Sequence, residues 1–155
     1  MTVFHSMNTT ASALTAQRLR MDVISSNIAN VDTTRAKKVN GEWEPYRKKS
    51  VVLTENQGSQ FSSFLNAAIG TYNKEEVGNG VTVSQIKSDT ETPFKLVYDP
   101  TSPDADADGY VKQSNVDLLS EMVDLISATR SYEANVTVLN ANKSMLMKAL
   151  EIGKG

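Results

Sequence analysis

The first candidate binding site in the sequence is an acidic turn. Asp104, Asp106 and Asp108 alternate with alanines and precede Gly109. This is the opening pattern of a calcium loop, in which carboxylates and a glycine turn surround the ion. Position twelve of such a loop would be Asn115 rather than the bidentate glutamate that supplies two oxygens. The pattern therefore favours a solvated acidic turn stabilised by local hydrogen bonds, with the three aspartates as a secondary metal candidate.

A second candidate is a basic segment with aromatic residues inside it. Between residues 35 and 49, six basic side chains face two acidic ones, and Trp43 and Tyr46 stand among them: Arg35, Lys37, Lys38, Arg47, Lys48 and Lys49. Such a mixture can bind single-stranded nucleic acid through phosphate contacts and base stacking. The net charge of −2 gives no field that attracts a polyanion. We expect a charged loop that meets an acidic surface on a protein partner, and no nucleic acid.

Most catalytic and metal chemistry is excluded by composition. The 155 residues include no cysteine and one histidine, His5, so thiolate sites, cysteine nucleophiles and multi-histidine metal centres are absent. No base or oxyanion arrangement can be assigned, and we expect no enzyme, no cofactor and no small-molecule substrate. The sequence has no run of 18 apolar residues, so we expect no membrane span. It also lacks the basic and apolar blocks of a cleavable secretory signal.

Two apolar seams predict long helices at the ends of the chain. Residues spaced alternately by four and three form one face of a helix in each segment, with the N-terminal segment taken as 1–34 and the C-terminal one as 114–155. The latter opens with Ser114 and Asp117 as a capping box and stops at Gly153. Leu119, Val123, Ile126 and Val138 widen its stripe. The expected assembly interface consists of Met7, Leu14, Met21, Ile28, Leu118, Met122, Leu125, Tyr132, Val136, Leu139, Leu146 and Leu150.

The two predicted helices are too long and too apolar to bury each other's apolar surface completely. An antiparallel pair within one chain would cover only the narrow line of seam residues. The C-terminal stripe is wider than that line. We therefore expect other chains to cover the remainder.

The middle of the chain, residues 35–113, is predicted to be a small β-rich insert. It holds all four prolines and six of the eight glycines. Strands are predicted at residues 50–54, 80–87 and 94–98, the last half-buried because apolar and polar residues alternate. Apolar residues at helical spacing between Phe61 and Tyr72 suggest a short helix. The predicted fold is mainly α, with the terminal helices paired as a coiled-coil-like core and a central β-hairpin and loop region outside it.

Three stretches of the sequence resemble the bacterial flagellar axial family of rod and hook proteins. The segment from Ser25 to Thr34, SSNIANVDTT, is similar to the N-terminal signature of that family, and Arg130–Asn135, RSYEAN, to its C-terminal helix. The segment from Pro93 to Val111 resembles the proximal rod proteins of the basal body in particular. The run after Thr34, Arg-Ala-Lys-Lys, departs from the Gly-Tyr/Phe-Lys of many relatives. The motif residues that match are Asn27, Ala29, Asn30, Thr33, Arg130, Tyr132, Glu133 and Asn135.

The resemblance implies a structural subunit of the basal-body rod. In this family the terminal helices pack with those of neighbours into a hollow helical drive shaft, which transmits torque and lets exported subunits pass. The implied partners are the chain itself, other rod proteins, the rod–ring adaptor protein and the flagellar type III export apparatus. The implied location is the flagellar basal body in the cell envelope, reached without a cleaved signal peptide.

Two alternatives remain open on the sequence. One is a different axial protein, such as another rod or hook component. The other is a calcium-binding interaction module that uses the acidic turn.

Overall fold

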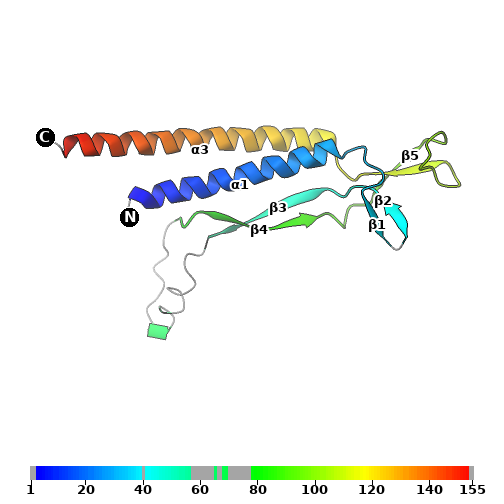
Figure 1. Ribbon diagram of the computed structural model, residues 1–155, viewed down its shortest axis with the longest axis horizontal. Coiled ribbons are helices and arrows are strands. Elements are labelled where there is room, and N and C mark those ends of the chain that lie inside the picture. The colour runs from blue at the N-terminus through cyan, green and yellow to red at the C-terminus, as the bar shows by residue number, and fades with distance from the viewer. Residues whose placement is uncertain (1–2, 40, 57–64, 66–67, 70–77, 154–155) are drawn as a thin grey trace. The chain divides into compact units, whose positions relative to one another are not determined.

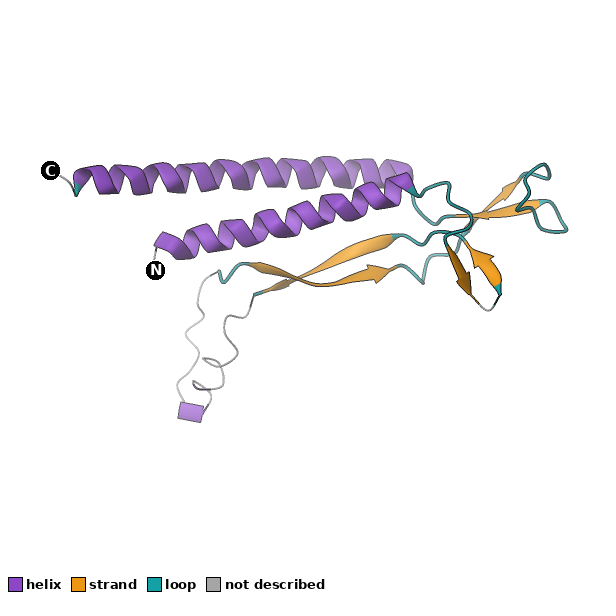
Figure 2. Ribbon diagram, viewed as in Figure 1, coloured by secondary structure: helices purple, strands orange, loops and turns teal. Residues whose placement is uncertain are grey.

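Two long helices flank a set of small β-hairpins. The computed structural model describes residues 3–39, 41–56, 65, 68–69 and 78–153. In chain order the elements are α1 (Val3–Ala29), β1 (Lys37–Val39), β2 (Glu42–Glu44), β3 (Lys49–Glu55), β4 (Val81–Ser88), β5 (Lys95–Tyr98), β6 (Tyr110–Gln113) and α3 (Leu118–Ile152) (Figure 1). β1 pairs with β2, β3 with β4, and β5 with β6, as separate two-stranded sheets (Figure 2). This arrangement confirms the predicted long helices and β-rich middle.

The ends of the helices follow from local hydrogen bonding. α1 gives way at Ala29 to turns in which the Asn30 and Thr33 amides donate to carbonyl oxygens three residues back, at 3.2 Å each. Asparagine favours such turns, because its side chain bonds to nearby backbone groups. α3 stops before Gly153, whose amide donates to the Ala149 carbonyl at 3.1 Å. The predicted stop of the C-terminal helix is therefore confirmed.

The start of α3 differs from the prediction. The helix begins at Leu118, and the Asp117 carboxylate caps it by accepting from the Leu119 amide at 3.3 Å. The Ser114 hydroxyl instead accepts from the Val116 amide at 3.2 Å. Residues 114–116 remain outside the helix and are all three buried, and a helical turn here would withdraw them from the core.

Three strands were predicted and three were missed. β3, β4 and β5 confirm the predictions at 50–54, 80–87 and 94–98. β1, β2 and β6 were missed because they are only three or four residues long, and β1 and β2 are also rich in charge. β1 and β2 are stabilised by contacts between the two strands. Lys37 lies opposite Glu44 and Lys38 opposite Trp43, with the Lys38 ammonium 6.0 Å from the centre of the indole ring. Such cross-strand pairs are favourable.

The predicted half-burial of β5 is wrong for the chain by itself. All four residues of β5 are exposed, including Leu96 and Tyr98, each at 65%. The buried residue of this sheet is Val111 on β6, at 4%. β5 is only four residues long and pairs with β6 alone among the described strands. Its apolar side chains alternate with polar ones, but no other described element of the chain covers them.

Within the segment predicted as a helix between Phe61 and Tyr72, the described residues Leu65, Ala68 and Ile69 are helical and exposed. Phe61, Phe64 and Tyr72 lie outside the described residues.

The chain forms two compact units, and each combines parts of both helices with part of the middle. Unit 1 comprises residues 1–18, 53–84 and 130–155. Its buried residues on α1 are Thr10 and Ala16. The Val81 amide donates to the Ser12 hydroxyl at 3.0 Å, and Asn142 of α3 donates to the Ser6 hydroxyl at 2.8 Å. A glycine is needed beside Ser12, because Gly80 has φ +87 and a Cβ there would collide with the Ser12 side chain.

Unit 2 comprises residues 19–52 and 85–129 and holds most of the buried core. Its core combines apolar and polar side chains from α1, the hairpins and the first part of α3. The buried residues are Val23, Ile24, Asn27, Pro45, Tyr46, Val111, Ser114, Asn115, Val116, Glu121 and Ala128. Since several of these are polar, their hydrogen bonds decide whether the core is stable.

Candidate assembly interface

Asn27 organises a buried junction in unit 2. Its side chain is 1% exposed and lies in the last helical turn of α1. The Asn27 amide donates to the Lys49 carbonyl at 2.8 Å, and its carbonyl oxygen accepts from the Lys49 amide at 3.0 Å and the Tyr46 hydroxyl at 3.0 Å. One side chain thereby fixes the start of β3 against the end of α1. This role needs a planar group that both donates and accepts.

Glu121 brings α3 into the same junction. Its side chain is 1% exposed and accepts from the Asn27 amide at 2.9 Å. The Lys48 ammonium forms a salt bridge with the other carboxylate oxygen at 2.6 Å. A buried charge is tolerated only when it is paired and hydrogen-bonded, and Glu121 meets both conditions. The junction therefore joins α1, β3 and the first turns of α3.

The other N-terminal motif residues build the turn after α1. The side-chain amide of Asn30 donates to the Ser26 backbone carbonyl at 2.8 Å. The Thr33 hydroxyl donates to the side-chain oxygen of Asn30 at 3.1 Å. The Thr33 carbonyl accepts from the Tyr46 amide at 3.0 Å, and Ala29 is exposed. The motif thus has a local structural purpose, which is to stop the helix and aim the chain at the hairpins.

The C-terminal motif lies in the middle of α3 and is mostly outward-facing. Arg130 and Glu133 are exposed, and Tyr132 and Asn135 are half-buried. The Asn135 amide donates to the Ser131 carbonyl one turn back at 2.8 Å. Unlike the N-terminal motif, this one has two charged side chains available to another molecule.

The α3 residues of the predicted interface divide by exposure. Most of the seam residues are half-buried, namely Leu125, Tyr132, Val136, Leu139 and Leu146. Leu118, Met122 and Leu150 are exposed at 44%, 50% and 70%. On α1 the predicted residues Met7, Leu14, Met21 and Ile28 are all half-buried.

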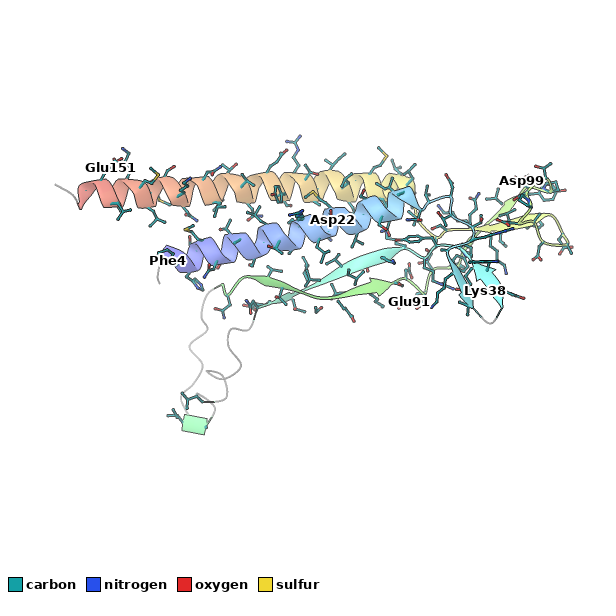
Figure 3. The ribbon with its side chains drawn as sticks, in the orientation of Figure 1. Phe4, Asp22, Lys38, Glu91, Asp99 and Glu151 are labelled. Carbon is teal, nitrogen blue, oxygen red and sulfur yellow. The ribbon has the colours of Figure 1, made fainter. Side chains whose placement is uncertain are left out.

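Further exposed apolar side chains of α3 lie outside the seam, and at about 100° per residue they spread over more than one side of the helix. We call this set the α3 flank; its members, all at least half exposed, are Leu119, Val123, Ile126, Val138, Met145 and Met147. Figure 3 shows side chains projecting from α3 along its length. Exposed apolar side chains that recur along one helix mark a binding surface more often than isolated ones do.

The acidic turn is tied to the rest of unit 2 by Asp104. That carboxylate accepts from the Thr34 hydroxyl at 2.6 Å and pairs with the Arg35 guanidinium. The hydrogen bond from Thr34 first, and then that from Arg35, lower the pKa of Asp104 below its usual range. Within the described ranges no three histidine or acidic residues are grouped so as to hold a metal ion. The secondary metal candidate of Asp104, Asp106 and Asp108 is therefore not among groupings that could hold an ion in this part of the chain.

Several residues of the basic segment find partners inside unit 2. Arg35 pairs with Asp104, and Lys48 with Glu121. The Arg47 guanidinium lies 4.2 Å from the centre of the Phe94 ring, and the Lys49 ammonium 5.4 Å from that of Tyr46. Much of the charge expected to meet a partner is thus engaged within the chain itself.

Glu121 is the important residue that the sequence analysis missed, and Tyr46 and Lys48 were identified only as part of the basic segment and not as members of this junction. Glu121 shares one helical face with Leu125 and Ala128, at spacings of four and seven. A lone acid on such a face was the available signal that it would be buried and paired. Nothing in the sequence identified its partners, which come from other segments.

Comparison with known families gives matches at both ends of the chain. Residues 7–37 match the family described as flagella basal body rod protein. Residues 107–152 match the family described as flagellar basal body rod FlgEFG protein C-terminal. No helix of the described residues is long and apolar enough to cross a membrane.

Full-length relatives extend this similarity across the chain. The flagellar basal-body rod protein FlgC of Bacillus subtilis is 65% identical over 99% of this chain and 100% of the relative. The corresponding protein of Borreliella burgdorferi is 44% identical over the whole of both chains. That of Salmonella typhimurium is 42% identical over 92% of each.

Proposed function

Because this chain belongs to the FlgC family of flagellar basal-body rod proteins, which are structural rod subunits and not enzymes, we propose how it assembles. The terminal segments, residues 1–34 and 114–155, pair in a coiled-coil-like manner with each other and with those of neighbouring subunits to form the core of a hollow tube. The central segment, residues 35–113, stays outside that core and adjusts contacts between subunits. The tube acts as a drive shaft and as a passage for exported subunits.

The proposed partners follow from that role. They are further copies of this chain, other rod proteins, the rod–ring adaptor protein and the flagellar type III export apparatus. The chain reaches the basal body through that export apparatus without a cleaved signal peptide.

One observation carries the proposal: α3 has almost no core of its own. It runs for 35 residues, and its buried residues are Glu121 and Ala128. Isolated helices are marginal in water, and most helical stability in proteins comes from burying an apolar face. Burial is worth about 25 cal/mol per Å² of apolar area, so covering the α3 flank with other helices supplies the missing stabilisation.

The predicted interface residues fit two different roles in this assembly. The half-buried seam residues pair the two helices, and the α3 flank with Leu118, Met122 and Leu150 meets neighbouring subunits. A contact between two different surfaces of like subunits generates an open helical filament when its rotation does not close into a ring. This is the symmetry that a tubular rod requires.

The test places a charge on the flank without disturbing the fold. Leu119→Asp and Val138→Asp change residues that are 72% and 50% exposed, so the isolated chain should keep its helical circular dichroism. A carboxylate buried between subunits is strongly unfavourable. We therefore expect both variants to be missing from isolated basal bodies and the cells to be non-motile.

Neighbouring polar residues provide matched controls. Ser120→Asp and Thr137→Asp introduce the same charge at exposed adjacent positions and should be incorporated normally. Normal incorporation of Leu119→Asp and Val138→Asp would show that the α3 flank is not the assembly surface.

A further inference from the structure

A cavity of about 320 Å³ lies in unit 2 between the β1–β2 hairpin, the acidic turn and β6. Two aromatic rings line it: Trp43, which is 54% exposed, and Tyr110, which is 46% exposed. Tyr110 also makes an edge-to-face contact with Tyr98, at 5.3 Å between ring centroids. Exposed tryptophan and tyrosine beside a cavity are the usual anchors of a binding site.

The charges around this cavity leave an acidic excess. Arg35 and Asp104 also line it, but they neutralise each other. Glu42 and Asp106 are exposed, and no cation of the described residues forms an ion pair with either of them. Lys112 is the remaining charged residue of the lining, so two free carboxylates stand against one free ammonium.

Aromatic rings together with free carboxylates suit a cationic side chain. A cation is attracted to the face of tryptophan or tyrosine and forms charge-assisted hydrogen bonds with carboxylates. Arginine suits such a site better than lysine, because its planar guanidinium can stack on a ring and bind a carboxylate with two hydrogen bonds.

The same chain presents an arginine with the matching surroundings. Arg130 of α3 is exposed, and no described residue forms an ion pair with it. One turn before it on the helix stands Ile126, 60% exposed, which could pack beside the aromatic rim. Arg18 and Arg20 of α1 have no exposed large apolar residue one turn away, so they would bring a charge without an apolar contact.

We propose that the cavity lined by Trp43, Tyr110, Glu42 and Asp106 receives Arg130 from a second copy of this chain. The proposal rests on the proposed function and specifies one subunit contact within it. Each copy carries both halves, the cavity and the arginine, so the contact is head-to-tail and can repeat.

Charge reversal tests the pairing. Asp106→Arg and Arg130→Asp should each lower incorporation into isolated basal bodies by at least about tenfold, because like charges then face each other. The double variant Asp106→Arg/Arg130→Asp should recover to within about threefold of the wild type, as expected when an opposite-charge pair is restored. Asp108→Arg changes an exposed aspartate that does not line the cavity and should incorporate normally. Normal incorporation of either single variant, or no recovery in the double variant, would overturn the proposal.

Cross-linking gives an independent readout. The chain has no cysteine, so Glu42→Cys/Arg130→Cys introduces one defined pair. Mild oxidation of isolated basal bodies should join copies of this variant into dimers and larger species, and neither single cysteine variant should do so beyond dimers. Absence of linked copies would overturn the inference while leaving the proposed function intact, since wild-type chain would still be present. Absence of the wild-type chain from basal bodies would instead overturn the proposed function.

Discussion

Substitutions in the buried junction of Asn27, Lys48 and Glu121 should lower the free energy of unfolding strongly, and their effects should not be additive. Asn27 makes four hydrogen bonds, two with the Lys49 backbone and one each with Tyr46 and Glu121. Asn27→Ala removes all four and leaves a carboxylate at 1% exposure with one partner fewer. Leaving a buried hydrogen-bonding group unpaired costs about 1–3 kcal/mol, and more when the group is charged, so we expect Asn27→Ala to lower the free energy of unfolding by at least about 3 kcal/mol.

Glu121→Gln should cost less, because it preserves shape and one acceptor. The Gln amide oxygen can still accept from Asn27, and what is lost is the charge-assisted bond with Lys48. Since the Lys48 side chain is 28% exposed, water can solvate its ammonium after the change. A salt bridge with one buried partner is worth more than the roughly 0–1 kcal/mol of an exposed pair and less than the roughly 3–5 kcal/mol of a fully buried one, so we expect a loss of about 1–3 kcal/mol.

The assay is urea unfolding followed by circular dichroism, with Trp43 fluorescence as a second probe in unit 2. The double variant Asn27→Ala/Glu121→Gln completes a cycle. Its total loss should fall short of the sum of the single losses by about 0.5–3 kcal/mol, as for residues in direct contact.

Two results would contradict the reasoning. A loss below about 0.5 kcal/mol for Glu121→Gln, the range of an ordinary surface change, would mean that the salt bridge with Lys48 contributes nothing. Full additivity in the cycle would mean that Asn27 and Glu121 are not coupled. Ser120→Ala, an exposed change in the adjacent position of α3, serves as the control and should alter stability little.

Two further predictions concern a glycine and a carboxylate. Gly80→Ala should destabilise the chain by at least about 1–2 kcal/mol in urea unfolding, because a left-handed conformation costs that much with a side chain and the new methyl would collide with Ser12; an unchanged midpoint would contradict the close approach of the two segments. Asp104, with its lowered pKa, stabilises the fold fully above about pH 4, the ordinary value for aspartate, and loses this contribution as pH falls through the lowered native pKa. Thr34→Val should raise that pKa more than Arg35→Gln does, as measured by carboxyl carbon NMR, because Thr34 is the larger cause; no change on Thr34→Val would refute this.

Local regularities are what could be predicted from sequence. Strand positions followed from alternation and turns from glycine. By contrast, β1 and β2 depend on which residues lie opposite each other, as Lys38 does with Trp43, and no single-strand pattern carries that information. The start of α3 was misplaced because burial of Ser114 and Val116 outweighs a favourable local cap.

Only part of the candidate assembly interface could be predicted, because exposure depends on contacts that the local sequence does not specify. The apolar positions of α3 follow from helical spacing, but their division into a half-buried seam and an exposed flank depends on what packs beside the helix. Leu125 and Ile126 are adjacent and equally apolar, yet one is half-buried and the other 60% exposed. A helix turns by 100° per residue, so neighbours in sequence meet different surroundings.

Two uninterrupted helices around a β-rich middle, with more apolar surface than they could cover for each other, are predictable from periodicity alone. Periodicity and the placement of glycine and proline act over a few residues, so they can be read locally. The burial and pairing of Glu121 depend instead on the folded chain, because its partner Asn27 is 94 residues away in sequence. A charge is stable in a core only when the folded chain brings that partner to it.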